Sequence, residues 1–243
     1  MAISDYFIRY LERRTILTDE DRARLAALRT EHVRFEPGDV IVAQERIVSR
    51  SCMMLRGMSA RVHQLNGRPD DRVITALHVP GDFVDLHGFL LAGLEHSVIA
   101  AGPAEVEFIS HDQLRDITEN SPHLTRLLWM STTIDAAIHR QWLVAAAALR
   151  SSSHLAHLIC EIYTRLNIVG AAHDYRFTMP LLQRELAEIL GYSPIHINRV
   201  VRDLRERGLV RWQGSEIEIV NWQGLVALAQ FRPDYLDLEQ IDR

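Results

Sequence analysis

The spacing of hydrophobic and polar residues changes along the chain. Residues 2–30 carry apolar positions at the spacing of two short helices, and Thr18 precedes the second one as an N-cap, with acidic residues after it. From 33 to 110 the apolar stretches become short, and Gly, Pro or Asn bounds each of them. Such a series is typical of strands joined by turns. It predicts a small antiparallel barrel or sandwich.

A long helix is predicted over 122–150, beyond a short amphipathic helix that begins near Ser110 and ends at Pro122. Its heptad positions are mostly apolar, which is the pattern of a coiled-coil seam. We expect a dimer interface that contains Leu124, Leu127, Ser131, Ile134, Ile138, Gln141 and Ala145. A helix that lies along its own barrel fits the same pattern, and the two arrangements can hold on different faces. A further helix follows, and a hinge is expected at 148–152.

Two helices and two strands are predicted between 181 and 219. Gly191 ends the first helix, Ser193 can cap the second, and Pro194 follows at its first position. Within the second helix a buried apolar stripe is expected, formed by Ile197, Val200, Val201 and Leu204. After Gly208 the pattern changes to a strand, a turn and another strand. Helix, tight turn, helix and hairpin together predict a winged helix-turn-helix.

Positive charge gathers in this segment. The whole chain has a net charge of −5, whereas 176–211 holds seven arginines against four acidic residues. A basic helix of this kind fits the major groove of DNA. The fork of Arg199 suits the two acceptors of a guanine, and the amide of Asn198 suits an adenine. Three further side chains suit phosphates, namely Ser193, His196 and Arg202. A solvated basic face on an interaction module is the alternative.

These segments together resemble the Crp-Fnr family of bacterial transcription regulators. The resemblance covers nearly the whole chain, through "FEPGDVIVAQ", "LRGMSARV", "VPGDFVDLHGFL", "FISHDQL" and "LLQRELAEILGYSPIHINRVVRDLRERGLV". It implies an α+β fold with an N-terminal antiparallel β-roll of the double-stranded β-helix or jelly-roll type, a long dimerisation helix and a C-terminal winged helix-turn-helix. The expected boundaries are 1–120 for the roll with its N-terminal helices, 121–149 for the dimerisation helix and 150–243 for the DNA-binding domain.

The resemblance also implies a homodimer that binds a two-fold symmetric operator in double-stranded DNA through paired recognition helices. Arg199 falls on the guanine-reading arginine of the family, and Ile195 and Asn198 fall on its two other base-reading positions. A glutamate is frequent where Ile195 stands. Because isoleucine can touch a thymine methyl but cannot accept from cytosine, a different half-site is expected. RNA polymerase is a further expected partner.

The roll lacks the residues with which family members bind cyclic AMP. The corresponding segments are "VDLHGFLLAG" and "LEHSVIAAG". Leu86 replaces the glutamate that holds the ribose, and His96, before Ser97, replaces the arginine that holds the phosphate. A neutral histidine is a poor substitute for a bidentate arginine, which argues against cyclic AMP. A pocket for another small molecule is expected at Asp85, Leu86, His87, Gly88, His96 and Ser97.

Other cofactors find little support in the sequence. The two cysteines, Cys52 and Cys160, lie far from the N-terminal region that holds the iron-sulfur cluster of oxygen-sensing relatives. Cys52 is expected in the core, with redox sensing as the alternative. A histidine of the roll could ligate haem, but a structural role is favoured for each, and also for His154 and His157 on their helix. The sequence therefore assigns no metal ligand and leaves the effector unidentified.

Functions of other classes fit less well. No Ser-His-Asp order, phosphate loop or paired-carboxylate motif stands out, and "GRPDD" at 67–71 suits a hairpin turn, so we do not expect an enzyme. The alternatives are a ligand-binding module whose winged helix contacts protein and a regulator without an effector. No apolar segment reaches the ~20 residues that span a bilayer. The first residues lack a signal-peptide core, so a cytoplasmic protein without membrane contacts is expected.

Overall fold

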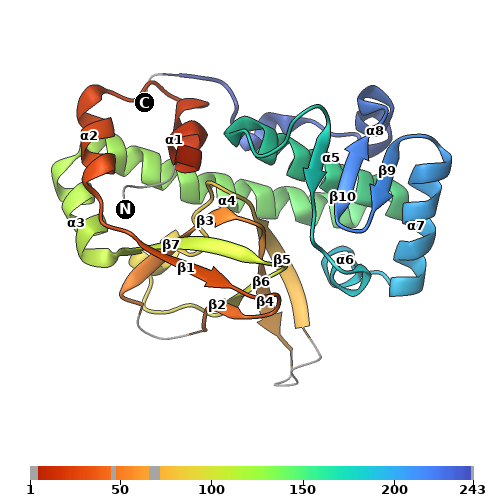
Figure 1. Cartoon of the computed structure of the whole chain (residues 1–243), viewed down its shortest axis with the longest axis horizontal. Helices are drawn as coiled ribbons and strands as arrows, with labels where there is room; N and C mark the ends of the chain where they lie inside the picture. The colour runs from red at the N-terminus through yellow and green to blue at the C-terminus, as the bar shows by residue number, and fades with distance from the viewer. Residues whose placement is uncertain (1–4, 45–47, 66–71, 242–243) are drawn as a thin grey trace.

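The computed structural model describes residues 5–44, 48–65 and 72–241. It has the α+β fold that the sequence predicts, with a β-roll, a long helix and a winged helix-turn-helix in that order (Figure 1). Two short helices, α1 (Asp5–Glu12) and α2 (Asp19–Ala27), precede the roll. Thr18 caps α2 in a reciprocal capping box, in which the N–H of Asp21 donates to the Thr18 hydroxyl and the N–H of Thr18 donates to the Asp21 carboxylate.

Two antiparallel sheets form the roll, one with the strand order β1-β7-β3 and the other with the order β2-β6-β4-β5. A core cluster joins them, with Cys52 and Met54 from the first sheet and Val98 and Ala100 from the second. Cys52 is fully buried, as a core residue should be. The strands are β1 (Glu31–Phe35), β2 (Val40–Val42), β3 (Arg50–Arg56), β4 (Ser59–Gln64), β5 (Arg72–His78), β6 (Ser97–Ala100) and β7 (Ala104–Ser110).

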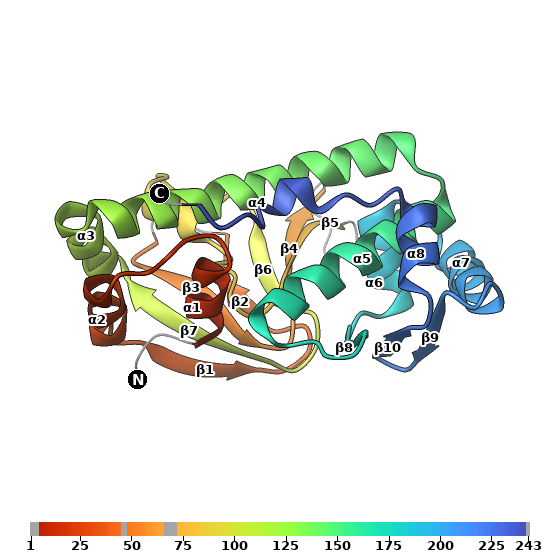
Figure 2. The same cartoon turned by 90° about the horizontal axis from the view of Figure 1, so that it is seen from above.

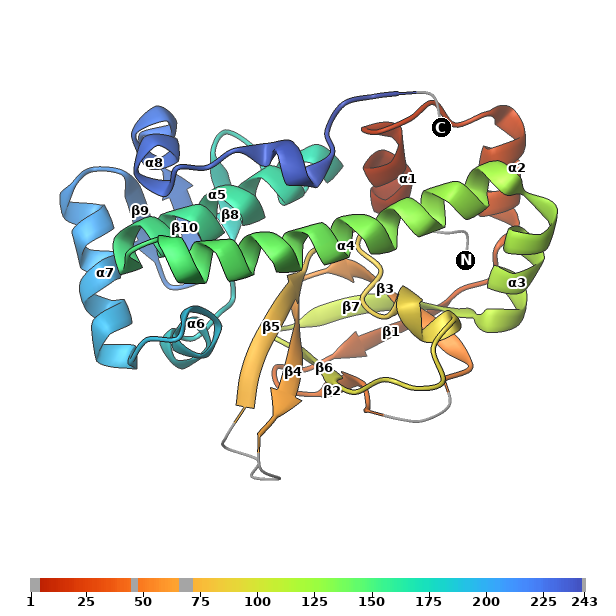
Figure 3. The same cartoon turned by 180° about the vertical axis from the view of Figure 1, so that it is seen from behind.

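Helix α4 (Pro122–Ala148) runs along the length of the molecule and connects the roll to the C-terminal part (Figures 2 and 3). The short helix α3 (His111–Asn120) precedes it, beginning after Ser110 as predicted, and the Ser110 side chain caps it. Proline occurs in α4 only at its first position, where no intrahelical donor is needed, so the helix continues unbroken for 27 residues. Two residues separate its end from α5 (Ser151–Val169), within the segment predicted as a hinge.

The predicted dimer seam of α4 faces the molecule's own core. Six of its seven residues are buried within the single chain, namely Leu124, Leu127, Ser131, Ile134, Ile138 and Ala145. Gln141 is half-buried. Heptad spacing identifies an apolar face of a helix but not what covers that face. Six of the seven residues are therefore covered by the chain itself and are not open to a second copy, as in the alternative of a helix lying along its own roll.

A second heptad stripe lies on the outer face of α4, in solvent. Its positions are three and four residues apart, and all except the half-buried Ala136 are exposed, namely Arg126, Trp129, Thr133, Arg140 and Leu143. Trp129 is 71% exposed and Leu143 is 73% exposed, and Val144 beside them is 56% exposed. Large apolar side chains gathered on one face of a surface helix mark a contact surface. Both faces of α4 thus carry apolar residues, but only one is covered by this chain.

The C-terminal part is built around α5. Its helices are α6 (Gln183–Leu190), α7 (Pro194–Glu206) and α8 (Trp222–Ala229). Its strands β8 (Arg176–Thr178), β9 (Val210–Gln213) and β10 (Glu216–Ile219) form a sheet in the order β8-β10-β9. Beyond α8 the chain returns along α4 through η2 (Pro233–Leu236) towards α1 (Figure 2). There the buried guanidinium of Arg14 donates to the carbonyl of Leu236, which joins the two ends of the chain.

No helix in the described ranges is long and apolar enough to cross a membrane. The length of α4 would suffice, but its outer face carries Arg126 and Arg140. The hairpin turn predicted at 67–71 lies outside the described residues.

Candidate DNA interface and its connection to the roll

The tight turn between α6 and α7 has the backbone that the sequence predicts. Gly191 adopts a φ of 72°, a left-handed conformation that favours glycine, and its N–H donates to the carbonyl of Ala187. The hydroxyl of Ser193 caps α7 by accepting from the N–H of His196, with N and Oγ 3.3 Å apart. Pro194 follows at the first position. The sequence thus fixes where α7 begins and which residues lie in its first turn.

One face of α7 packs into the C-terminal core. Ile197, Val200 and Leu204 are buried, as the apolar stripe predicts, and Val201 is half-buried. This packing fixes the rotation of the helix about its axis. It therefore also decides which side chains point away from the protein.

The outer face of α7 carries the residues predicted to reach base edges. Ile195 is 76% exposed, and Asn198 and Arg199 are exposed. The Asn198 amide donates to the carbonyl of Pro194 at 3.3 Å, so it has one weak intrahelical contact. The helix forms the outer edge of the molecule, on the far side of the C-terminal part from the roll (Figure 1). A partner could approach this face without displacing another element.

The arginines of the C-terminal part fall into two groups. Arg176 and Arg211 both pair with Glu218, and Arg207 pairs with Asp203 at 2.9 Å. No ion pair within the described part of the chain involves Arg184, Arg199, Arg202 or Arg205. Three of these four unpaired arginines lie on α7. The excess positive charge of the segment is therefore concentrated on the predicted recognition helix.

His196 differs from its prediction. The sequence places it outward, at a phosphate, whereas the structure turns its ring towards Tyr192, with the ring centroids 5.1 Å apart. Its Nε2 is buried and has no hydrogen-bond partner within the described residues. Tyr192 in turn contacts His154 of α5. The His196 ring packs against Tyr192, which lies just before the start of the same helix. The predicted outward orientation of His196 is therefore corrected.

The residues predicted for an effector pocket point in different directions. Asp85 is buried in the roll, where its carboxylate accepts from the backbone N–H of Cys52 at 2.6 Å. Burial raises the pKa of Asp85 to about 7, although that hydrogen bond and the charge of Arg61 oppose the rise. Leu86 points towards α4, where it lines a small cavity with Ile134. Asp85 and Leu86 therefore do not line a common pocket.

The histidines of the predicted pocket do come together. The rings of His87 and His96 have centroids 5.2 Å apart. Burial, and next the charge of Arg61, lowers the pKa of His96 to about 4, so this imidazole is neutral at physiological pH. Ser97 instead accepts from the backbone N–H of Gln44, and Gly88 packs against the side chain of Leu94. The predicted set is thus brought together only in part, at the two histidines and at the small cavity that Leu86 and His87 both line.

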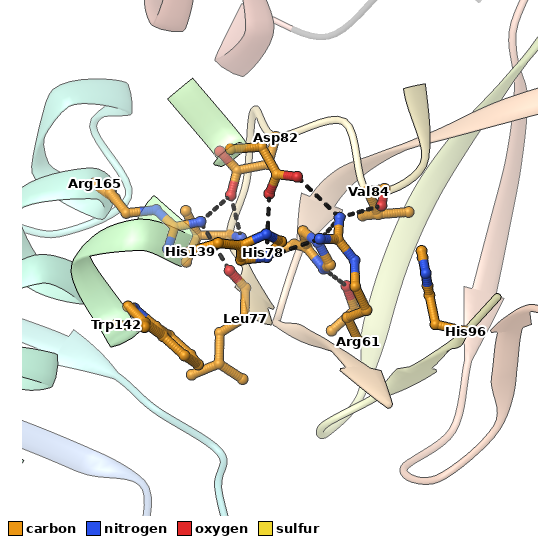
Figure 4. A network of polar contacts seen from close by, with 12 residues as sticks. Arg61, Leu77, His78, Asp82, Val84, His96, His139, Trp142 and Arg165 are labelled. Carbon is orange, nitrogen blue, oxygen red and sulfur yellow. Dashed lines mark hydrogen bonds and ion pairs between the residues drawn. The ribbon is translucent and has the colours of Figure 1, made fainter. Parts of the chain in front are cut away.

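A buried arginine connects the roll to α4. Arg61 of β4 is 4% exposed. Its guanidinium donates to His139 Nε2 at 2.8 Å and to Asp135 Oδ2 at 3.1 Å, both on α4. It also donates to the carbonyl of Val84 in the roll (Figure 4). Beside it, burial and the charge of Arg61 hold the pKa of His78 well below its usual value. Arg61 is thus the polar link between the roll and the long helix.

A second buried arginine connects the roll to α5. The Arg165 guanidinium lies 2.6 Å from Asp82 Oδ2 and donates to the carbonyl of Leu77, both at the end of the roll (Figure 4). It also pairs with Glu161, one turn earlier on α5. Glu161 is fully buried and accepts further hydrogen bonds from Trp142 of α4 and from Tyr235 of the C-terminal segment. Four parts of the chain therefore meet at one buried charge cluster.

Sequence reasoning missed this network. In strand β4, Arg61 alternates with Ala60 and Val62, and the alternation alone suggests a solvent-facing side chain. The available signal was on α4, where Asp135 and His139 are four residues apart beside the apolar seam. Polar residues at that spacing next to a buried stripe call for a buried partner, but the pattern does not say which one.

Comparison with known proteins agrees with this architecture. Residues 153–228 match the family model of the Crp-like helix-turn-helix domain. The transcriptional regulatory protein btr of Bordetella pertussis is 23% identical over 165 residues, which cover 68% of each chain. The transcriptional activator protein FnrA of Stutzerimonas stutzeri is 23% identical over 64% of each chain. The aligned regions span about two thirds of these relatives.

The fold is also found in solved structures. FixK2 from Bradyrhizobium japonicum superposes with a TM-score of 0.71 over 83% of this chain and 98% of its own, at 17% identity. The relatives are regulators and not enzymes, in agreement with the expectation from the sequence. The C-terminal part therefore carries a Crp-like helix-turn-helix domain, and the chain as a whole is similar in sequence and fold to transcription regulators of the Crp/Fnr type.

Proposed function

We propose that the chain binds a two-fold symmetric operator in double-stranded DNA as a homodimer, with α7 of each copy in the major groove. The observation that carries this proposal is the free outer face of α7, where Arg199 and Arg202 are exposed and lack ion-pair partners among the described residues. The fork of Arg199 suits guanine O6 and N7. Ser193 and Arg202 suit flanking phosphates, which fix the register of the helix without specifying sequence.

The proposed dimer forms through the outer face of α4. The heptad stripe around Trp129, Thr133, Arg140 and Leu143 has the spacing of a coiled-coil seam, and its two large apolar residues are otherwise in water. A two-fold axis through such a seam would place the two copies of α7 for half-sites about one helical turn apart. The two faces of α4 then have separate roles, one against the roll and one against the partner.

The roll is the proposed sensor of a small molecule other than cyclic AMP. Arg61 ties the roll to α4, and Arg165 ties it to α5, so a ligand that displaced either contact would act on the dimer helix or on the DNA-binding part. Such an effector must bind the DNA-competent arrangement more tightly than the other. RNA polymerase as a partner and the cytoplasm as the location are expectations that follow from this function.

The test combines a selection with a matched pair of variants. Purified full-length protein is incubated with a random duplex pool, and the retained DNA is sequenced. Wild type should enrich a palindrome, and Arg199→Ala should bind it at least about 30-fold more weakly, because the dimer loses one bidentate base contact of about 1–3 kcal/mol in each copy. Arg232→Ala is the control, because Arg232 is 82% exposed, pairs with Asp234 and lies away from α7. It should bind like wild type.

The outcomes separate the proposed function from its alternatives. A palindrome enriched without any added ligand would identify a regulator that needs no effector. Equal weak binding of wild type and Arg199→Ala, with the dimer intact in sedimentation, would reject sequence-specific DNA binding. The winged helix would then be assigned to protein contacts.

A further inference from the structure

We propose that His63, Glu95 and His96 form a binding site for a divalent transition-metal ion at the end of the β-roll. One donor atom from each of these residues lies within 4.8 Å of the other two. Among the described residues, this is the only group of three or more His, Cys, Asp or Glu donors with that spacing. Neither the DNA-binding proposal nor the comparisons assign a function to these side chains together.

Strand pairing brings the two histidines together. β4 and β6 are antiparallel, with Val62 opposite Ser97. His63 follows Val62 in β4, and His96 directly precedes Ser97 at the start of β6, so the two histidines lie just beyond this pair. Their ring centroids are 5.5 Å apart. The site therefore combines one histidine held in β4 with two residues that directly precede β6.

His96 has an unused nitrogen. Its side chain is 1% exposed, and its Nδ1 lies 3.1 Å from Glu95 Oε1, which can only accept. The proton of the neutral ring is therefore on Nδ1, and the lone pair of Nε2 is left buried with no partner among the described residues. A buried acceptor without a donor costs free energy. A metal ion can take a lone pair from this imidazole without protonating it.

The donor set indicates the class of metal. Two neutral imidazoles and one carboxylate suit Zn²⁺, Fe²⁺, Co²⁺ or Ni²⁺, whereas Mg²⁺ and Ca²⁺ prefer oxygen ligands alone. Three protein ligands leave a position open for water or a small molecule. Ligand bonds of about 2.0–2.2 Å would require the donor atoms to move closer together. Glu95 now contacts Nδ1, on the opposite side of the His96 ring from Nε2, so its carboxylate must leave Nδ1 to reach a metal at Nε2. Glu95 is mostly exposed and His63 half-exposed, so both can turn without disturbing the core.

The site also lies next to the link with α4. His63 and Arg61 are two residues apart in β4, so their side chains leave the same face of the strand. Arg61 is the residue that contacts Asp135 and His139 of α4. One ligand of the proposed site is therefore two residues along β4 from the arginine that contacts the long helix.

Metal binding by the full chain tests the proposal independently of DNA. Isothermal titration with Zn²⁺ should give one site per chain, and Co²⁺ should add visible absorption bands on the same titration. Glu95→Gln and His63→Ala should each weaken Zn²⁺ binding at least about tenfold, because each removes a direct ligand. The control is Glu105→Gln. Glu105 Oε2 lies 2.9 Å from His32 Nε2, so this variant also removes a carboxylate beside a histidine. Among the described residues, this pair belongs to no group of three donors. The control variant should bind like wild type.

Two results would overturn the proposal. One is a wild-type chain that takes up no stoichiometric Zn²⁺ or Co²⁺. The other is binding by Glu95→Gln and His63→Ala that equals binding by wild type and Glu105→Gln, since the ion would then be held elsewhere. Circular dichroism of each variant confirms that the fold is retained.

Discussion

Arginine has opposite surroundings at the two ends of this molecule. On α7, Arg199 and Arg202 are exposed and have no ion-pair partner in the described part of the chain. At the junction of the roll with α4 and α5, Arg61 and Arg165 are almost fully buried, and each contacts at least one carboxylate and a backbone carbonyl. Arginine thus lacks ion-pair partners where a binding partner is expected, and it is paired with carboxylates where elements of the chain meet.

Burial and pairing distinguish the arginines that stabilise the structure from those that are free for recognition. A buried guanidinium must be paired, because an isolated charge in the interior is costly. An exposed one contributes little to stability even when it is paired. Substitution at the junction should therefore change folding, whereas substitution on α7 should change binding alone.

The largest effect is expected for Arg165→Met. Methionine has a similar length but leaves Asp82 and the fully buried Glu161 without their common cation. Removal of one partner from a buried ion pair costs about 3–5 kcal/mol of unfolding free energy. Urea unfolding of the variant measures it. The control is Arg232→Met at an exposed pair, which should change stability by less than about 0.5 kcal/mol. A loss below about 1 kcal/mol at Arg165 would contradict a structural role.

Asp85 differs from the acids at the junction, because it is buried and has no ion-pair partner within the described residues. Its pKa is raised from 3.8 to about 7, first by burial. In the unfolded chain the carboxyl loses its proton near pH 4, so between pH 4 and 7 the folded state holds more protons and stability falls as pH rises. For wild type this fall is on the order of 4 kcal/mol. Asp85→Asn should remove it, as urea unfolding at several pH values would show. A variant that follows the wild-type pH profile would argue against the buried acid.

Local pattern predicted the elements of the fold and the face of α7. Gly191, Ser193 and Pro194 fix the turn through backbone geometry, which is a property of those residues themselves. Apolar spacing then gave the buried stripe of the helix and, by difference, its outer residues. These inferences needed no knowledge of other parts of the chain.

Predictions that depend on which distant part of the chain contacts a residue were less successful. The seam of α4 was identified as apolar, but the pattern could not say whether the roll or a second copy covers it, and Ile134 and Ile138 proved to be buried by the chain itself. Arg61 and Arg165 were missed for the same reason, since a charged residue is buried only when distant partners meet it. His196 turned onto Tyr192 because a ring contact was available.

The smallest effects come from a comparison within the C-terminal part, between unpaired Arg202 and paired Arg207. Arg202→Ala should leave stability unchanged within about 0.5 kcal/mol. If each copy contacts one phosphate through it, the slope of log affinity for the selected operator against log salt should become shallower by about 1.8 for the dimer. Arg207→Ala breaks an exposed pair with Asp203 and should cost about 0.3–0.5 kcal/mol of stability, with the salt slope unchanged. Equal slopes for the two variants would mean that an unpaired arginine on α7 is no better placed for DNA than a paired one. The distinction between paired and unpaired arginines would then not predict which of them contact DNA.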